Sequence, residues 1–186
     1  MNAYLILIRG INVGGKNIVK MEKLRKCMAE EGFTNISTYI ASGNVILTSE
    51  KPAGEIKTLI ESMLSERFEL DDGFVKVLVL THDQLQRVIE HKPDGFGEQP
   101  EKFHSDVIFL MELDEAEAMK VFNPREGVDE VWPGDGVIYS QRLSALRTKS
   151  RLSKIMGTPA YKAMTIRNWN TTTKLLEMIR QVKNNL

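Results

Sequence analysis

The residues whose types and spacing best suit chemistry lie in one loop, residues 9–17, which follows a short apolar stretch. The loop reads R-G-I-N-V-G-G-K-N, so it carries three glycines, one arginine, one lysine and two asparagines. Such a loop can present backbone N–H groups and cations to an anion. The alternative is a long loop whose glycines serve backbone geometry alone. The candidate ligand-binding residues of this loop are Arg9, Asn12, Gly14, Gly15 and Lys16.

Residues 10–17 are also similar to a phosphate-binding P-loop, G-x-x-x-x-G-K-[ST], which stands between a strand and a helix. Here Asn17 replaces the hydroxyl that would hold magnesium, and the next helical pattern starts only near Lys20. No later predicted strand ends in a convincing magnesium-binding aspartate. The sequence therefore does not favour a nucleoside triphosphatase.

Two further polar clusters could contribute ligand contacts. Residues 42–44 (S-G-N) stand in a predicted hairpin turn, where their polar groups either face a ligand or shape the turn. Residues 165–171 (T-I-R-N-W-N-T) precede the last helical pattern, whose N-terminal amides could face an anion. Alternatively, Asn170 or Thr171 caps that helix and Trp169 is a buried anchor. These clusters add the candidate ligand-binding residues Ser42, Asn44, Arg167, Asn168 and Asn170.

The sequence contains no recognisable catalytic or metal-binding pattern. His82, His91 and His104 lack metal-ligand spacing, and Cys27 is the only cysteine. We therefore expect no metal site, no cofactor and no internal disulfide. No G-x-S-x-G motif occurs, and the acidic residues single out no acid–base pair, so no catalytic residue is assigned.

The net charge of zero hides a segregation of charge along the chain. Residues 1–49 carry six basic and three acidic side chains, residues 50–141 nine and twenty-one, and residues 142–186 ten and one. Such asymmetry can mark a phosphate or nucleic-acid partner. Alternatively, the basic tail folds against the acidic middle of the chain and neutralises it.

The apolar runs are too short to span a membrane, and the N-terminus lacks a signal-peptide pattern. Together with the single cysteine, these features lead us to expect a soluble cytoplasmic protein without a membrane partner.

The first half of the chain predicts the order β-α-β-β-α-β, which is that of a ferredoxin-like unit. Its predicted strands cover residues 4–8, 36–40, 45–48 and 75–80, its helices begin near Met21 and Pro52, and residues 71–73 (D-D-G) form a turn. In an antiparallel sheet of order 4-1-3-2, the loop after the first strand and the turn after the second lie at one edge. We therefore expect residues 9–17 and 42–44 to form one polar, glycine-rich rim.

The second half of the chain repeats this order less clearly. Its predicted strands cover residues 106–111, 128–132, 137–139 and 163–166, and its helices follow Asp114, surround residues 150–156 and begin near Thr171. Residues 92–102 contain two prolines and two glycines, which predicts a linker. The fold prediction is α+β, a duplication of two ferredoxin-like (βαββαβ) subdomains with antiparallel sheets, residues 1–91 and residues 103–186, the second with a C-terminal helix.

Three motifs together resemble a bacterial family catalogued as Domain of Unknown Function 1697. They are residues 7–17 (L-I-R-G-I-N-V-G-G-K-N), 38–45 (T-Y-I-A-S-G-N-V) and 165–171 (T-I-R-N-W-N-T). The M-x-x-L-R pattern at residues 21–25 and the G-F pair at residues 32–33 are also similar. The resemblance extends from residue 3 to about residue 180. It implies a duplicated ferredoxin-like fold and carries over no catalytic residues.

These observations predict a protein that binds a phosphorylated small molecule or a nucleic acid through its Gly-rich, basic loop edge. Two alternatives stay open. One is an enzyme acting on a small anionic substrate between the two subdomains, and the other is a protein-interaction module.

Overall fold

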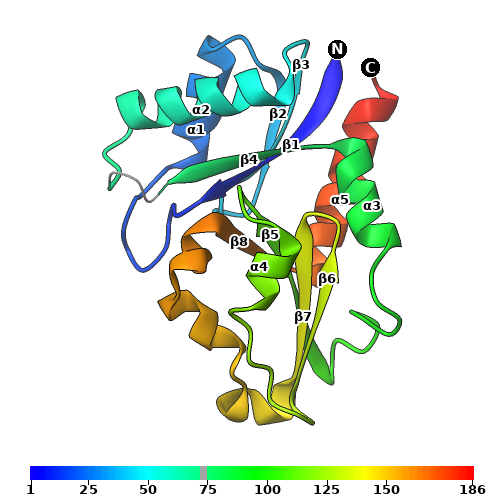
Figure 1. Ribbon diagram of the computed structural model, residues 1–186. Helices are drawn as coiled ribbons and strands as arrows, with labels where there is room; N and C mark the ends of the chain where they lie inside the picture. Colours follow the sequence, from blue (N-terminus) through cyan, green and yellow to red (C-terminus); the bar gives the residue numbers. More distant parts are fainter. Residues whose placement is uncertain (72–74) are drawn as a thin grey trace. The chain divides into compact units, whose positions relative to one another are not determined.

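The computed structural model describes residues 1–71 and 75–186 (Figure 1). The chain divides into two compact α+β units, the first comprising Met1–Gln86 with Lys174–Leu186 and the second Arg87–Thr173. Each unit contains one four-stranded antiparallel sheet. Residues 72 and 73 of the predicted turn at 71–73 lie outside the described residues. Within the described parts of the chain, no helix has the length and apolar character needed to cross a membrane.

The first unit has the predicted element order and the predicted strand order. Its sheet is ordered β2-β3-β1-β4, and all neighbouring strands are antiparallel. Its elements are β1 (Asn2–Arg9), α1 (Met21–Glu30), β2 (Thr34–Tyr39), β3 (Asn44–Ser49), α2 (Ala53–Arg67) and β4 (Lys76–Thr81), after which α3 (His82–Glu90) begins.

Apolar side chains at helical spacing attach α1 and α2 to the same face of the first sheet (Figure 1). In α2, Ile56, Ile60, Met63 and Leu64 are buried, as their i, i+4, i+7, i+8 spacing predicts. They share one core with alternate residues of the strands, such as Ile6 of β1. Burying each of these side chains contributes roughly 1.5–3 kcal/mol. This core holds β1 in the centre of the sheet, so the loop that follows β1 starts from a fixed point.

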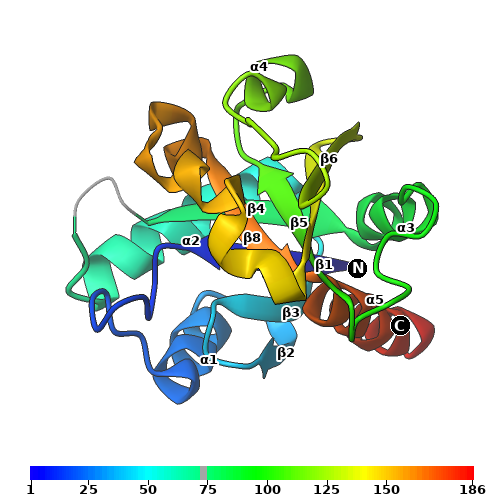
Figure 2. The same cartoon turned by 90° about the horizontal axis from the view of Figure 1, so that it is seen from below.

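The second unit has the sheet order β6-β7-β5-β8. Its elements are β5 (Phe103–Leu110), α4 (Glu115–Met119), β6 (Asp129–Gly134), β7 (Val137–Leu143), three 3-10 helices (Ser144–Lys149, Leu152–Gly157 and Pro159–Ala163), β8 (Met164–Asn168) and the start of α5 (Trp169–Asn184). The 3-10 helices, yellow to orange in Figure 2, connect β7 to β8. Unlike α1 in the first unit, α4 is only five residues long.

Two expectations about the second unit were wrong in detail. The helix expected around residues 150–156 is a 3-10 segment, followed by an extended Thr158 and by Pro159, whose ring cannot enter an α-helix interior. The helix after Asp114 is capped as expected by that side chain, which accepts a hydrogen bond from the Glu117 amide. This helix was expected to include Phe122, but it ends at Met119.

Residues 92–102, which were expected to form a linker, contain no helix or strand. Phe96 in this segment is nevertheless fully buried, with edge-on ring contacts to Trp132, Tyr139 and Trp169 at centroid distances of 5.2–6.1 Å. The segment is thus anchored within the second unit by one aromatic side chain.

Replacing Gly43 with alanine tests the close approach that shapes the predicted rim. Gly43 has a φ of +78°, and an added Cβ would lie 2.6 Å from the Ile8 carbonyl oxygen and 3.0 Å from Ile8 Cβ. We expect G43A to lower the free energy of unfolding by about 3 kcal/mol, measured by urea denaturation, because backbone strain adds to the clash.

The matched control is G54A in α2, where no atom lies within 4 Å of an added Cβ. That variant should leave stability unchanged or raise it by up to about 1 kcal/mol, because alanine favours a helix. Equal unfolding midpoints for the two variants would contradict the close approach.

Candidate functional site

The Gly-rich loop folds into a small hairpin. The Lys16 amide donates to the Val13 carbonyl at 3.0 Å, and the Asn12 amide donates to the Asn17 carbonyl at 3.0 Å. Between them, Gly14 and Gly15 have φ values of +58° and +76°, as the two central residues of a type I′ turn require. The loop therefore lacks P-loop geometry, because two of its amides are bonded within the hairpin and α1 begins only at Met21.

The Asn12 side chain ties this hairpin to the turn between β2 and β3. Its Nδ2 donates to the carbonyls of Val19 and Ala41, at 2.9 and 2.7 Å, and its Oδ1 accepts from the Val19 amide at 2.8 Å. The predicted meeting of the two segments at one edge of the sheet is confirmed by the bond to Ala41. Because both Nδ2 protons bond to the backbone, Asn12 shapes the rim formed by the hairpin and the turn.

The remaining candidate residues of the rim differ in exposure. Arg9 and Asn44 are buried, and Asn44 Nδ2 donates to the Tyr39 carbonyl and to Ser42 Oγ at 3.1 and 2.9 Å. Gly14, Gly15 and Lys16 are exposed. The exposed hairpin tip is therefore the part of the predicted set that a ligand can reach directly.

An open groove of about 890 Å³ lies beside the hairpin. It is lined by Asn17, Ile18, Lys20, Lys23, Ser65, Glu66, Arg67, Phe68 and Glu69. Lys23 Nζ donates to the Arg67 carbonyl at 2.7 Å and lies 4.5 Å from the centroid of the Phe68 ring. Sequence reasoning missed the groove because its two walls, the start of α1 and the end of α2, are more than 40 residues apart in the chain.

The candidate residues near the C-terminus do not form one patch. Arg167 and Asn168 are neighbours in β8, so their side chains point to opposite faces of the second sheet. The Arg167 guanidinium is buried and donates to Thr165 Oγ1 at 2.9 Å and to the Ile166 carbonyl at 2.8 Å. Burial lowers the pKa of Arg167 to about 10, so the side chain is still charged at neutral pH.

Asn168, and neither Asn170 nor Thr171, caps the last helix. Its Oδ1 accepts a hydrogen bond from the Thr171 amide at 2.8 Å, and α5 begins at Trp169. The expected cap was therefore two to three residues too late, because an asparagine caps from the position just before the helix and Asn168 occupies it. Trp169 was expected to be a buried anchor; its ring contacts Phe96 at 5.2 Å, but the residue is only partly buried.

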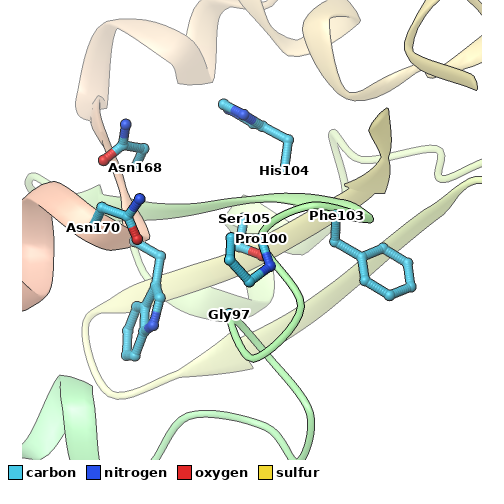
Figure 3. Close-up of a pocket in the computed structure, with 8 residues that line it drawn as sticks. Gly97, Pro100, Phe103, His104, Ser105, Asn168 and Asn170 are labelled. Carbon is cyan, nitrogen blue, oxygen red and sulfur yellow. The ribbon is translucent and has the colours of Figure 1, made fainter. Parts of the chain in front are cut away.

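Asn168 and Asn170 instead line a small pocket of about 90 Å³ in the second unit (Figure 3). The lining residues are Gly97, Pro100, Phe103, His104, Ser105, Asn168, Trp169 and Asn170. His104 Nε2 lies 3.1 Å from Asp106 Oδ2, and the two side chains share one face of β5. Sequence reasoning treated His104 only as a metal ligand, although the H-x-D spacing in a strand could have shown this pair.

The pocket offers no nucleophilic serine. Ser105 Oγ donates to Gln141 Oε1 at 2.7 Å, on the opposite face of β5 from His104. Among residues 1–71 and 75–186, no three metal-binding side chains gather into a cluster. The chemistry of this pocket therefore depends on the imidazole and on the asparagine amides.

Two aspartates on this face of the second sheet, the partly buried Asp106 and the buried Asp129, have pKa values shifted in opposite directions. Burial raises the pKa of Asp106, although the charges of His104 and Arg142 oppose the shift. Burial would also raise the pKa of Asp129, but hydrogen bonds from the Arg151 amide, Ser150 and the Arg125 amide outweigh it, so its pKa is lowered.

Replacing each aspartate with asparagine should therefore change stability with opposite signs. A raised pKa means that the ionised Asp106 destabilises the folded state above that pKa, so D106N should leave the free energy of unfolding at pH 7 unchanged or higher. A lowered pKa means that ionised Asp129 stabilises the fold above its unfolded-state pKa, so D129N should cost about 1–2 kcal/mol at pH 7. Urea denaturation at neutral and acid pH measures the free energy of unfolding of both variants. The difference between D129N and the wild type should become smaller as the pH falls.

Removing the cap of α5 should weaken the second unit modestly. We expect N168A to lower the free energy of unfolding by about 1 kcal/mol. N168D keeps an acceptor oxygen, so its free energy of unfolding should stay close to that of the wild type. Equal losses for the two variants in urea denaturation would contradict the capping role.

Comparison with known proteins relates this fold to one family. Residues 1–139 match the family described as "Protein of unknown function (DUF1697)". The solved structure of conserved bacterial protein SP0830 from Streptococcus pneumoniae is similar, with 25% identity, a TM-score of 0.80, and coverage of 96% of this chain and 98% of that chain. None of the curated proteins matched this chain. The family match, which covers residues 1–139, shows that the chain belongs to the DUF1697 family of proteins of unknown function.

Proposed function

We propose that the first unit binds a phosphorylated small molecule in the groove beside the Gly-rich hairpin. The observation that carries this proposal is the presence of Lys20, Lys23 and Arg67 in a groove of about 890 Å³. Ligand sites of small molecules typically measure about 300–1,000 Å³. Glu66 and Glu69 also line the groove, and Arg67 is paired with Glu30 at 3.3 Å. Lys20, Lys23 and Lys16 of the neighbouring hairpin are therefore the main cations for an anion.

The fixed position of Lys23 makes the groove suited to an anion. Its hydrogen bond to the Arg67 carbonyl and its place over the Phe68 ring limit the freedom of the ammonium group before a ligand arrives. A lysine so held can bind a phosphate as a point charge. The exposed Ile18 side chain on the hairpin side of the groove offers apolar surface to the rest of the ligand.

In this proposal, the predicted ligand residues take two roles. Gly14, Gly15 and Lys16 face the ligand, because all three are exposed at the hairpin tip and no atom lies within 4 Å of a Cβ added at either glycine. The other candidates of the first unit hold the hairpin and the turn in place. Of the candidates of the second unit, Asn168 and Asn170 line a separate pocket, whereas Arg167 is buried outside it.

A protein-interaction module is the second candidate function, favoured by exposed apolar side chains at the same rim. Val13, Ile18 and Ile40 are 63%, 59% and 55% exposed. Ile40 also has a φ of +49°, which is uncommon for a β-branched residue. An apolar side chain that is both exposed and strained gains nothing from packing within the fold, so a partner surface would explain it.

The proposal extends to the architecture and to the location of the protein. We propose that both units are ferredoxin-like and arose by duplication, with the two repeats in subdomains 1–91 and 103–186, joined by residues 92–102. By compactness, residues 92–102 belong to the second unit and Lys174–Leu186 to the first. The strand orders β2-β3-β1-β4 and β6-β7-β5-β8 correspond strand by strand, which supports this view. The single cysteine supports a reducing, cytoplasmic location.

Removing two exposed lysines tests phosphate binding. We expect the wild-type protein to bind ATP in isothermal titration calorimetry and the K16A/K20A double variant to bind about 5–30-fold more weakly. Two lost charge contacts, each worth about 1 kcal/mol at the surface, give this range. K26A, an exposed lysine of α1 outside the groove, should bind like the wild type.

The proposal is overturned if the wild-type protein binds none of ATP, ribose 5-phosphate and pyrophosphate. It is also overturned if the wild type, K16A/K20A and K26A bind ATP with equal affinity. A ligand preference for oligonucleotides, with affinity falling steeply as salt rises, would instead favour nucleic-acid binding, because each phosphate contact releases counterions. Catalytic turnover of a bound phosphate compound would favour the enzyme alternative.

A further inference from the structure

We propose that the pocket at the junction of β8 and α5 binds a small carboxylate, which His104 contacts directly and which Asp106 serves by positioning His104. This site lies within the second unit and is independent of the groove in the first.

The pocket exists because two neighbouring strands end at different places. The pairing of β8 with β5 ends at Asn168, which lies opposite Asp106. β5 extends further, and Phe103 and His104 pair only with β7. The side of β5 that β8 leaves open is closed by the start of α5 and by the loop that contains Gly97 and Pro100. Figure 3 shows the His104 side chain extending toward Asn168, whereas the Phe103 ring points away from both asparagines.

The side chains around the pocket supply mainly hydrogen-bond donors. His104 Nε2 is paired with Asp106, which leaves Nδ1 as a second donor when the imidazole is protonated. Asn168 uses its Oδ1 to cap α5, so its Nδ2 is the group left for a ligand. Asn170 is exposed at the pocket and offers a second amide. A carboxylate, which only accepts hydrogen bonds, is the natural complement of these groups.

The charged side chains around His104 largely balance one another. Asp106 faces both His104 and Arg142, and Arg142 lies opposite His104 in the β5–β7 register and opposite Asp129 in the β6–β7 register. Asn168 and Asn170 add no charge from the α5 side, so the pocket selects its ligand through hydrogen-bond donors and not through an excess of positive charge.

The volume of the pocket sets the size of the ligand. A water molecule needs about 10–15 Å³ of such space, so about 90 Å³ holds roughly six to nine non-hydrogen atoms. Lactate and similar small carboxylates fall in or just below this range. Pro100 and the Trp169 ring provide apolar contact for a methyl group on the wall of the pocket.

A purely structural role explains the pair of His104 and Asp106 less well than a binding role does. The His104 side chain is 43% exposed and the Asp106 side chain 16%, so the carboxylate is the desolvated member of the pair. Exposed or half-exposed pairs of this kind contribute about 0–1 kcal/mol. Burial raises the pKa of Asp106, so its ionised form opposes folding. Because ionised Asp106 costs folding free energy, its presence is better explained by a binding role, in which it orients the imidazole of His104.

An NMR titration of the full-length protein with lactate tests the proposal, with chloride at equal ionic strength as the control. We expect saturable shifts of the His104 ring signals and of the Asn168 and Asn170 side-chain amides. H104Q should weaken binding about tenfold or more, since it removes a charge-assisted hydrogen bond. H91Q, at an exposed histidine outside the pocket, should bind like the wild type.

Two further variants separate binding from a structural role. D106N should lower the fraction of His104 that carries its proton on Nε2 and weaken lactate binding, while the protein stays folded. N170A provides a second variant that leaves the His104–Asp106 pair intact and should also weaken binding.

The proposal is wrong if lactate and acetate produce no saturable shifts at the pocket, or if H104Q and N170A bind them as well as H91Q does. None of these outcomes bears on the phosphate groove, because the two sites share no residues.

Discussion

The rim of the first unit depends on the side-chain amide of Asn12. This side chain donates to the Val19 and Ala41 carbonyls and accepts from the Val19 amide, all of them loop groups that would otherwise lack a strand partner. Asparagine also tolerates the positive φ of this position better than most residues do. The hairpin thereby stays fixed to a turn 29 residues away, and the exposed Lys16 has a defined place beside the groove.

A second asparagine applies the same principle on the other side of the hairpin. Asn17 is buried, its Nδ2 donates to the Gly10 carbonyl at 2.9 Å, and its Oδ1 accepts from the Asp71 amide at 2.8 Å. In this loop, asparagines therefore act as substitutes for strand pairing. The polar residues of this loop therefore have two roles. Some of them hold the loop in shape, and others, such as Lys16, are exposed to a ligand.

The segregated charge of the sequence is partly resolved by pairing within each unit. Lys183 of the basic tail lies 3.0 Å from Asp83 of the acidic middle, within the first unit. Arg142 acts on Asp106 and Asp129 within the second. The pair at Lys183 is exposed and therefore contributes little to stability. Arg142 matters more, because it sets the charge around a pocket. Local pairing of this kind supports the view that tail and middle neutralise each other, without excluding a phosphate partner.

The sequence by itself determined the order of helices and strands and the meeting of the two Gly-rich segments, because both follow from local periodicity and from strand direction. The spacing of Ile56 and Ile60, for example, predicts a helix from the sequence without knowledge of any tertiary contact. Tertiary structure alone decided which polar residues a ligand can reach. An amide such as that of Asn12 bonds to whichever group lies nearest, and that group can be 29 residues away. For the same reason, only the fold showed that His104 borders a pocket with Asn168 and that the end of α2 completes a groove.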